Sequence, residues 1–391
     1  MLAGVWLVYN AFGITSISMA TMVKLIRDDL GINNTEMGAI IGAWQMVYIG
    51  AAIPCGALLD RLGARRCIFI AAAVIALSNL LRGLSTDWLS LYLAVAVFGL
   101  GGPMISIGAP KVIAQWFEGR ERGVAMGLYS AGSSLGSIST LTLANSLWVP
   151  LVGGDWRNVF FLYGSWALFI GFVWLAINLH PTPRSAEKLE ASRPRDSQRG
   201  VFLTLIKHPA VQTVMVMSVC TFFINHGLNA WLPEILRTRG MSLSEAGFWA
   251  STPQIVGLFS ALIIPRYAVP EMRFHILGAL ITAAGIGTLL IHFGEGWTLL
   301  AGLICQGIAR ASFTTIIMLT LTETKGVDAR TVGLAGGLFF SCGEIGGVLG
   351  PFSLGFLSDI SHGFDLPLYV LRSEEHTSEL QSRFGISYAV F

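Results

Sequence analysis

The stretch from Gly56 to Arg66 reads GALLDRLGARR, a short polar connection with three arginines and one aspartate. It closes one apolar run, Met37 to Leu59, and leads into another, Cys67 to Leu84. A helix that crosses a bilayer needs about 20 mostly apolar residues. Two such runs joined by a tight basic turn predict a pair of membrane-spanning helices whose connection lies in water.

The composition of the whole chain agrees with a membrane protein. Of its 391 residues, 53% are hydrophobic and only 12% are charged, which leaves too little polar surface for a soluble globular protein. The formal charge of +2 is too small to suggest a nucleic-acid partner. The five cysteines lie in or at the ends of apolar runs without metal-ligand spacing, so we expect no disulfide, no metal and no cofactor.

Apolar runs of spanning length recur along the chain. Six come first, at 2–22, 37–59, 67–84, 88–109, 124–147 and 159–179. Five more and the start of a sixth follow, at 211–232, 246–264, 276–293, 297–321, 332–357 and from 366. Residues 180–209 between the two sets are rich in charge and proline, as linkers are. We therefore predict an all-α integral membrane protein of twelve helices, with an N-terminal half at 1–179, a cytoplasmic linker at 180–209 and a C-terminal half at 210–371.

The end of the chain changes character. From Arg372 the sequence reads RSEEHTSELQS, then three residues, then ISYAVF, where the last membrane helix should continue. We interpret 372–391 as a translated sequencing adapter, which leaves the twelfth helix truncated. The alternative is an ordinary disordered tail.

A repeat relates the two sets of helices. One group before and into the second apolar run recurs 209 residues later: Gly31, Ile32, Thr35, Glu36 and Gly38 return as Gly240, Met241, Ser244, Glu245 and Gly247. A second group recurs at an offset of 210: Arg120, Gly127, Leu128 and Gly136 return as Arg330, Gly337, Leu338 and Gly346. The sequence thus predicts two pseudo-symmetric six-helix bundles in the same orientation.

The distribution of basic residues predicts the orientation in the membrane. With the linker in the cytoplasm, ten further Lys and Arg residues lie on the same side: Arg61, Arg65, Arg66, Lys111, Arg120, Arg122, Arg266, Arg273, Lys325 and Arg330. Six lie on the other: Lys24, Arg27, Arg82, Arg157, Arg237 and Arg239. By the positive-inside rule the N-terminus is cytoplasmic, and we expect a multi-pass protein of the inner membrane.

The loop at 56–66 resembles the signature loop of the major facilitator superfamily, G-x-L-x-D-R-x-G-x-R-R. The resemblance implies two six-helix halves around a central binding site. It also implies a cytoplasmic gate formed by Gly56, Asp60, Arg61, Gly63, Arg65 and Arg66. Within that gate, Asp60 would face the positive end of the eleventh helix near Arg330. A generic basic turn is the alternative reading.

Three longer segments narrow the resemblance. They read PKVIAQWFEGRERGVAMG at 110–127, DWRNVFFLYG at 155–164 and HGLNAWLPEILRTRG at 226–240. Together they are similar to the cyanate and nitroimidazole permease branch of the superfamily.

Two ionisable residues lie in the middle of apolar runs. Arg310 is central in the tenth run and Glu344 in the eleventh. Such residues are costly in lipid and usually face a partner or a water-filled path. We expect Arg310 to receive an anionic group of the solute, and Glu344 to compete for Arg310 or to carry a coupling proton. A fixed ion pair between the two is the alternative.

Neutral polar residues supply further candidates for the substrate or coupling site. Asn225, His226 and Asn229 lie within about one turn of the seventh run, with 225 and 229 on one helix face. Asn10 lies near the middle of the first run, and Gln45 lies in the second. The resemblance implies that the first and seventh helices line the cavity. A histidine with a purely structural role is the alternative for His226.

Glu36 and Glu245 occupy equivalent positions of the repeat. We expect each carboxylate to lie in the first turn of a helix, after Thr35 and Ser244 as the N-cap residues, rather than to carry protons.

These features predict a secondary active transporter and not an enzyme. The chain has no phosphate-binding loop for ATP and no soluble catalytic domain. We expect alternating-access transport of a small anionic organic solute, coupled to protons, by a monomer in the lipid bilayer. Export of hydrophobic drugs or metabolites is an alternative, and a membrane receptor without transport is another.

Overall fold

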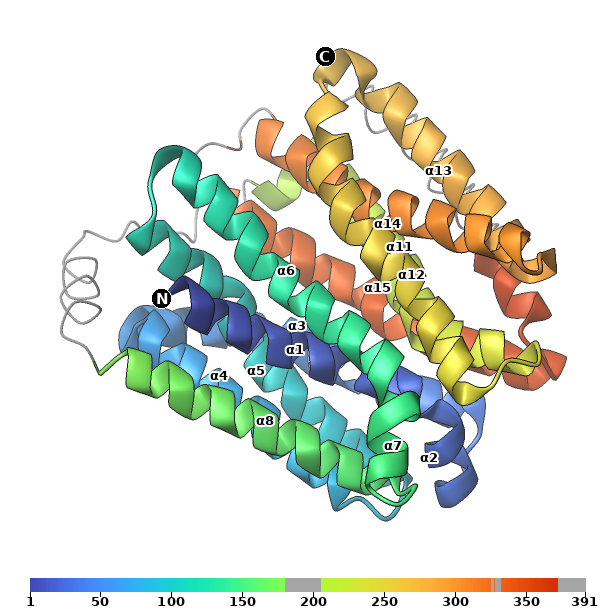
Figure 1. Cartoon of the computed structure of the whole chain (residues 1–391). Helices are drawn as coiled ribbons and strands as arrows, with labels where there is room; N and C mark the ends of the chain where they lie inside the picture. Colours follow the sequence, from blue (N-terminus) through green and yellow to red (C-terminus); the bar gives the residue numbers. More distant parts are fainter. Residues whose placement is uncertain (180–204, 325–326, 328–331, 372–391) are drawn as a thin grey trace.

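The computed structural model describes residues 1–179, 205–324, 327 and 332–371. Most of the predicted linker, 180–204, and the predicted adapter segment, 372–391, lie outside these residues, so the domain boundaries remain predictions. Every regular element in the described residues is a helix (Figure 1).

The helices follow the order of the predicted runs. The first half contains α1 (Leu2–Thr21), α2 (Val23–Leu30), α3 (Asn34–Leu62), α4 (Ala64–Gly83), α5 (Trp88–Trp116), α6 (Gly119–Leu143), a π-helical turn η1 (Ala144–Trp148), α7 (Val149–Leu151) and α8 (Trp156–Ile177). The second contains α11 (Pro209–Thr238), α12 (Leu243–Ile263), a 3-10 turn η2 (Ile264–Tyr267), α13 (Pro270–Phe293), α14 (Trp297–Glu323) and α15 (Val332–Ser361). Residues 365–371 are helical where the truncated last helix was predicted.

Ten of the described helices are long and apolar enough to cross a membrane. The predicted run at 124–147 corresponds to α6, which does not reach that apolarity because Gly, Ser and Thr take many of its positions. It packs against α1 on one side and α12 on the other. A helix covered by other helices needs small residues for close packing more than it needs apolar ones.

Two helix pairs join the halves in a reciprocal way. The second long helix of the first half, α3, packs against the fifth of the second half, α15. Likewise α6, the fifth long helix of the first half, packs against α12, the second of the second half. A third contact across the halves joins α1 to α11. Figure 1 shows the blue to green helices of the first half beside the yellow to red helices of the second. The arrangement agrees with the pseudo-symmetry that the sequence repeat predicts.

Equivalent glycines bring the paired helices together. A Cβ atom on Gly38 of α3 would collide with the backbone carbonyl oxygen of Pro351 in α15. A Cβ on Gly247 of α12 would collide with the carbonyl oxygen of Leu141 in α6. Gly38 and Gly247 are separated by the repeat offset of 209, and Leu141 and Pro351 by the offset of 210. The sequence repeat therefore reappears as one contact made twice.

Both glycine contacts lie toward the same end of the bundle. We call the end that holds the C-terminus of α8 and the N-terminus of α11 the linker end, and the opposite end, where α3 and α12 begin, the distal end. In Figure 1, the short helices α2 and α7 mark the distal end of the first half.

Polar contacts also close the distal end between the halves. The carboxylate of Asp359 in α15 accepts the backbone N–H groups of Asn34 at 3.1 Å and Thr35 at 2.7 Å, and the Thr35 hydroxyl at 2.6 Å. Unpaired N–H groups at a helix N-terminus favour a negative charge. A second link joins Arg27 of α2 to the buried carboxylate of Glu234 in α11 at 3.7 Å. The structure is therefore in a state whose distal end is closed.

The N-cap residues differ from those expected. Asn33 and Ser242, not Thr35 and Ser244, cap α3 and α12, and each forms a capping box with the glutamate three residues on, Glu36 or Glu245. The glutamates do lie in the first turn, as predicted. The expected cap residue Thr35 is instead inside the helix, where its hydroxyl reaches Asp359 across the interface.

The first prediction concerns the repeated glycine contact. Gly38→Ala and Gly247→Ala should each destabilise the distal-closed state, because overpacking a tight contact costs about 1–3 kcal/mol. Gly50→Ala is the matched control, since nothing lies within 4 Å of a Cβ at this position in α3. The melting temperature of the purified protein should be a few degrees lower in the first two variants than in the control. Equal melting temperatures in all three would contradict the contact.

The second prediction concerns Asp359. Asp359→Ala removes the acceptor that holds the N-terminus of α3, so the distal end should open more readily. Spin labels at the exposed distal positions Leu151 and Trp297, in a variant without the native cysteines, measure this opening by pulsed EPR. We expect a larger population of long distances than in the parent. Asp365→Ala, which removes an exposed carboxylate paired within the second half to His292, should leave the distribution unchanged.

Candidate functional site

Two neighbouring cavities lie between the halves. The first, of about 270 Å³, is walled by α6, α11, α12 and α14, and we call it the Arg310 cavity. The second, of about 220 Å³, is walled by α1, α3, α6, α11 and α12, and we call it the His226 cavity. Asn229 and Gln254 line both. The two spaces therefore meet at a shared polar boundary between the halves.

Arg310 supplies the positive charge of the first cavity. Arg310 is 9% exposed, and its Nη2 donates a hydrogen bond to Oδ1 of Asn229 at 2.5 Å. The same Asn229 oxygen accepts the amide of Gln254 at 3.0 Å. The guanidinium of α14 is thus bonded to α11, whose Asn229 is in turn fixed by Gln254 of α12.

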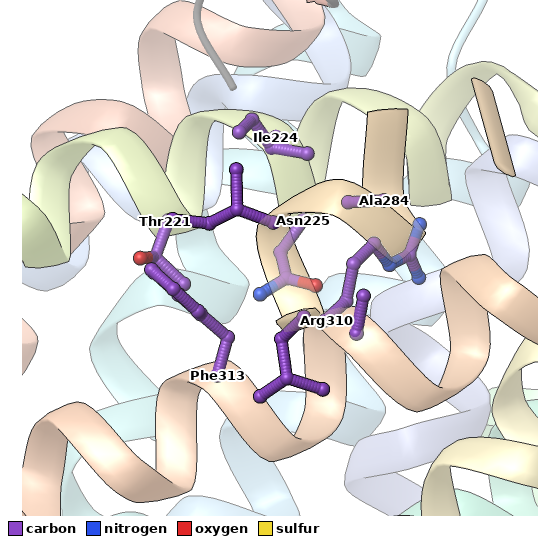
Figure 2. Close-up of a pocket in the computed structure, with 9 residues that line it drawn as sticks. Thr221, Ile224, Asn225, Ala284, Arg310 and Phe313 are labelled. Atoms are coloured by element: carbon purple, nitrogen blue, oxygen red, sulfur yellow. The ribbon is translucent and has the colours of Figure 1, made fainter. Parts of the chain in front are cut away.

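Asn225 and Thr314 extend this polar wall. The Asn225 amide donates to the Thr314 hydroxyl at 3.2 Å, and that hydroxyl donates to the Arg310 carbonyl oxygen at 3.1 Å. Figure 2 shows Asn225 reaching from α11 into the space between the helices, with the Arg310 guanidinium on the side away from Thr221 and Phe313. The recess in that view has a volume of only about 40 Å³ and has room for water but not for an organic solute.

An ionisable pair lies beside the second cavity, and His226 is the member that lines it. His226 Nε2 lies 3.8 Å from Oε2 of Glu344, whose side chain is 7% exposed. On the other side of the ring, Nδ1 lies 3.2 Å from the amide nitrogen of Gln45, a residue that is 1% exposed. Trp44 contacts the ring edge-on, with centroids 5.9 Å apart. The pair therefore connects the second half, through His226, to α3 of the first.

The predicted residues of the seventh helix lie as their spacing suggested. Asn225 and Asn229 both line the Arg310 cavity, and His226 lines the other one. Gln45 also lines the His226 cavity. Asn10 lies outside both cavities, because its amide donates to the carbonyl oxygen of Gly132 at 3.4 Å and so links α1 to α6.

Arg310 and Glu344 have different neighbours in α11. Arg310 bonds Asn229, and Glu344 lies beside His226 one turn earlier. The direct ion pair between Arg310 and Glu344 remains a prediction. Arg310 lines its own cavity, and Glu344 lies beside His226, which lines the neighbouring one.

Several lining residues were not among the candidates. Thr314 follows Arg310 by four residues and could have been found by helical spacing. Ser16, Ser133 and Ser137 line the His226 cavity from α1 and α6, and serines in membrane helices are too common for the sequence to single them out.

The predicted gate lies at the linker end of the first half. Gly63 adopts φ = 82°, which favours glycine and turns the chain from α3 into α4. Arg65 donates to the carbonyl oxygen of Asn178 at 3.2 Å, and its own carbonyl oxygen accepts the indole N–H of Trp174 at 2.9 Å. These contacts fasten the start of α4 to the end of α8.

The remaining residues of the predicted gate take no part in these contacts. Gly56 lies within α3, and Arg61 and Arg66 are exposed. The side chain of Asp60 and the whole of Arg330 lie outside the described residues, so the predicted contact between them remains a prediction.

Comparisons with known proteins agree with this architecture. The family model "Major Facilitator Superfamily" matches residues 2–362. The "Probable galactarate/D-glucarate transporter GudP" of Escherichia coli K12 is 23% identical over 92% of this chain and 88% of its own length. The "Probable L-galactonate transporter" of the same organism is 26% identical over 93% of this chain and 83% of its own length.

A solved structure has the same fold. The inward-facing, occupied form of a bacterial homologue of the human lysosomal transporter Spinster superposes with a TM-score of 0.72 at 16% identity, covering 100% of this chain and 95% of that one. The helices and the two halves conform to this architecture. The chain belongs to the major facilitator superfamily and is a multi-pass membrane transporter, not an enzyme.

Proposed function

We propose that this transporter moves a small organic anion by alternating access, with the anionic group bound by Arg310, and that transport is coupled to protons. The observation that carries the proposal is a buried guanidinium in the wall of a cavity between the two halves. A solute bound there contacts both halves, so its binding affects how they move relative to each other.

The chemistry of the cavity favours an anion. A guanidinium presents several N–H donors in a planar arrangement that suits a carboxylate. Asn225, Asn229 and Gln254 add neutral amides around it. An apolar drug would offer no charge or acceptor to this polar wall, so the cavity supports export of hydrophobic compounds less well.

The names of similar proteins support an acidic solute with several hydroxyl groups. Galactarate, D-glucarate and L-galactonate, which those names mention, are hydroxylated carboxylates. The three serines of the His226 cavity offer hydroxyl partners next to the Arg310 cavity. The resemblance to the cyanate and nitroimidazole permease branch favours a smaller solute, which leaves those serines unused.

Glu344 is our candidate for the group that binds the coupling proton. It is buried beside His226, which lines the cavity next to that of Arg310, so its charge can respond to a solute bound between the halves. A receptor without transport would have no need of such a group.

The remaining features of the proposal concern the setting in the cell. The excess of Lys and Arg at the linker end supports a cytoplasmic N-terminus and a cytoplasmic linker at 180–209. We propose that the protein acts as a monomer in the inner membrane, because the central path lies between the halves of one chain.

The third prediction tests Arg310. Arg310→Gln keeps a hydrogen-bonding side chain but removes the charge, so proteoliposome uptake of galactarate or galactonate should lose at least about tenfold in kcat/KM, since hydrogen bonds to charged groups contribute about 1.5–3 kcal/mol. Arg266→Gln, which changes an exposed arginine of the same half, is the control and should transport normally. Normal uptake by a normally inserted Arg310→Gln variant would contradict the proposed anion site.

A further inference from the structure

Three side chains from three helices converge above one glycine. A Cβ atom on Gly347 of α15 would lie 2.5 Å from Glu344 Oε2, 3.1 Å from Gln45 Cγ and 3.3 Å from His226 Cδ2. The 2.5 Å approach is closer than real Cβ atoms show and the other two are tight, so a side chain at position 347 would displace the Glu344 carboxylate and press on Gln45 and His226. The space above Gly347 is thus filled by Gln45, His226 and Glu344 together.

The amide of Gln45 determines which nitrogen of the His226 ring carries the proton. A neutral imidazole has one N–H donor and one acceptor nitrogen. When the Gln45 amide nitrogen donates to Nδ1, as their 3.2 Å separation allows, the ring proton is on Nε2. That N–H faces the Glu344 carboxylate at 3.8 Å, so the ionised carboxylate is stabilised.

The same amide can respond to a change in protonation. The Gln45 carbonyl oxygen Oε1 is buried and has no hydrogen-bond partner in the described residues. If the ring gains a proton on Nδ1, a rotation of the amide presents this oxygen as the acceptor. Gln45 can therefore bond His226 in either state, but only by reorienting.

The bond between Gln45 and His226 crosses the boundary between the halves. Gln45 belongs to α3, and His226 and Glu344 belong to α11 and α15. Other groups also act on the pair: the Tyr48 hydroxyl of α3 interacts electrostatically with Glu344, and Arg310 of α14 with His226. From α12, the uncharged Gln254 lines the same cavity. Among these groups only Gln45 hydrogen-bonds the ring from the first half.

We propose that Gln45 is the positioning residue of the coupling site: it orients the His226 proton toward Glu344 and links the protonation of that pair to the contact between the halves. The inference rests on the proposed role of Glu344 in proton coupling. A proton that reaches the buried Glu344 carboxylate neutralises it and removes its attraction for the His226 N–H. The ring is then free to change tautomer, and the Gln45 amide must rotate or release it.

The fourth prediction uses infrared spectroscopy, which needs no solute. The full chain in liposomes is titrated with acid, and the protonated carboxyl band that is missing in Glu344→Gln is assigned to Glu344. Gln45→Met keeps the length of the side chain but cannot donate, so the Nε2–H is no longer held toward Glu344 and the pH midpoint of the Glu344 band should rise. In Gln45→Glu the new carboxylate accepts from Nδ1 and favours a ring with N–H groups on both nitrogens, whose positive charge should lower the midpoint. We expect about one pH unit between the two variants.

A second pair of variants changes glycines of α15, one of which contacts the cluster and one of which does not. Gly347→Ala should shift the midpoint in the same direction as Gln45→Met, because its Cβ separates the three side chains. Gly337→Ala, on the same helix with nothing within 4 Å of its Cβ, should leave the midpoint unchanged. Normal membrane insertion of each variant is checked in parallel.

The outcomes separate the two proposals. A Glu344 band that titrates but keeps one midpoint in all Gln45 and Gly347 variants overturns the role of Gln45 and leaves the proposed function standing. A spectrum in which Glu344→Gln removes no titrating band overturns both the role of Glu344 and that of Gln45. Opposite shifts with an unchanged Gly337→Ala control support the inference, since a side chain that only packs would not reverse the shift.

Discussion

Charge is costly in the interior of a membrane, at about 3 kcal/mol for an arginine at the centre of an inserted helix. This protein nevertheless holds Arg310 in the middle of α14. The surrounding side chains show how that cost is met: Asn229 accepts from the guanidinium, Gln254 fixes Asn229, and the water-sized recess and the larger cavity border the same arginine. A group that needs this much support in the resting protein is well suited to bind an anion that completes it.

The contacts between the halves differ in kind along the bundle. At the distal end the halves are joined by close packing at glycines and by charge-assisted hydrogen bonds to a helix N-terminus, and these contacts form or break together. Near the middle, the side chains of Gln45 and His226 form a hydrogen bond across the halves. Separation of the halves at either place alters the surroundings of the ionisable pair. The geometry thereby offers a physical route from protonation to the movement of the halves.

Much of the architecture could be predicted from the sequence, because hydropathy determines which segments enter lipid and a repeat offset relates the halves. The offsets of 209 and 210 even anticipate that Gly38 and Gly247 make equivalent contacts. Helical spacing likewise placed Asn225 and Asn229 together. The bond from Asp359 to Thr35 was not predictable, since it joins residues 324 positions apart that meet only after the halves pack. The convergence over Gly347 was missed for the same reason.

The central claim is that the cavity recognises negative charge through Arg310. Isothermal titration calorimetry on the purified protein tests it most directly, with galactonate compared against its neutral amide, which has the same carbon skeleton and hydroxyl groups. The account predicts that the carboxylate binds and the amide binds at least about tenfold more weakly. Equal affinity for the two would contradict it.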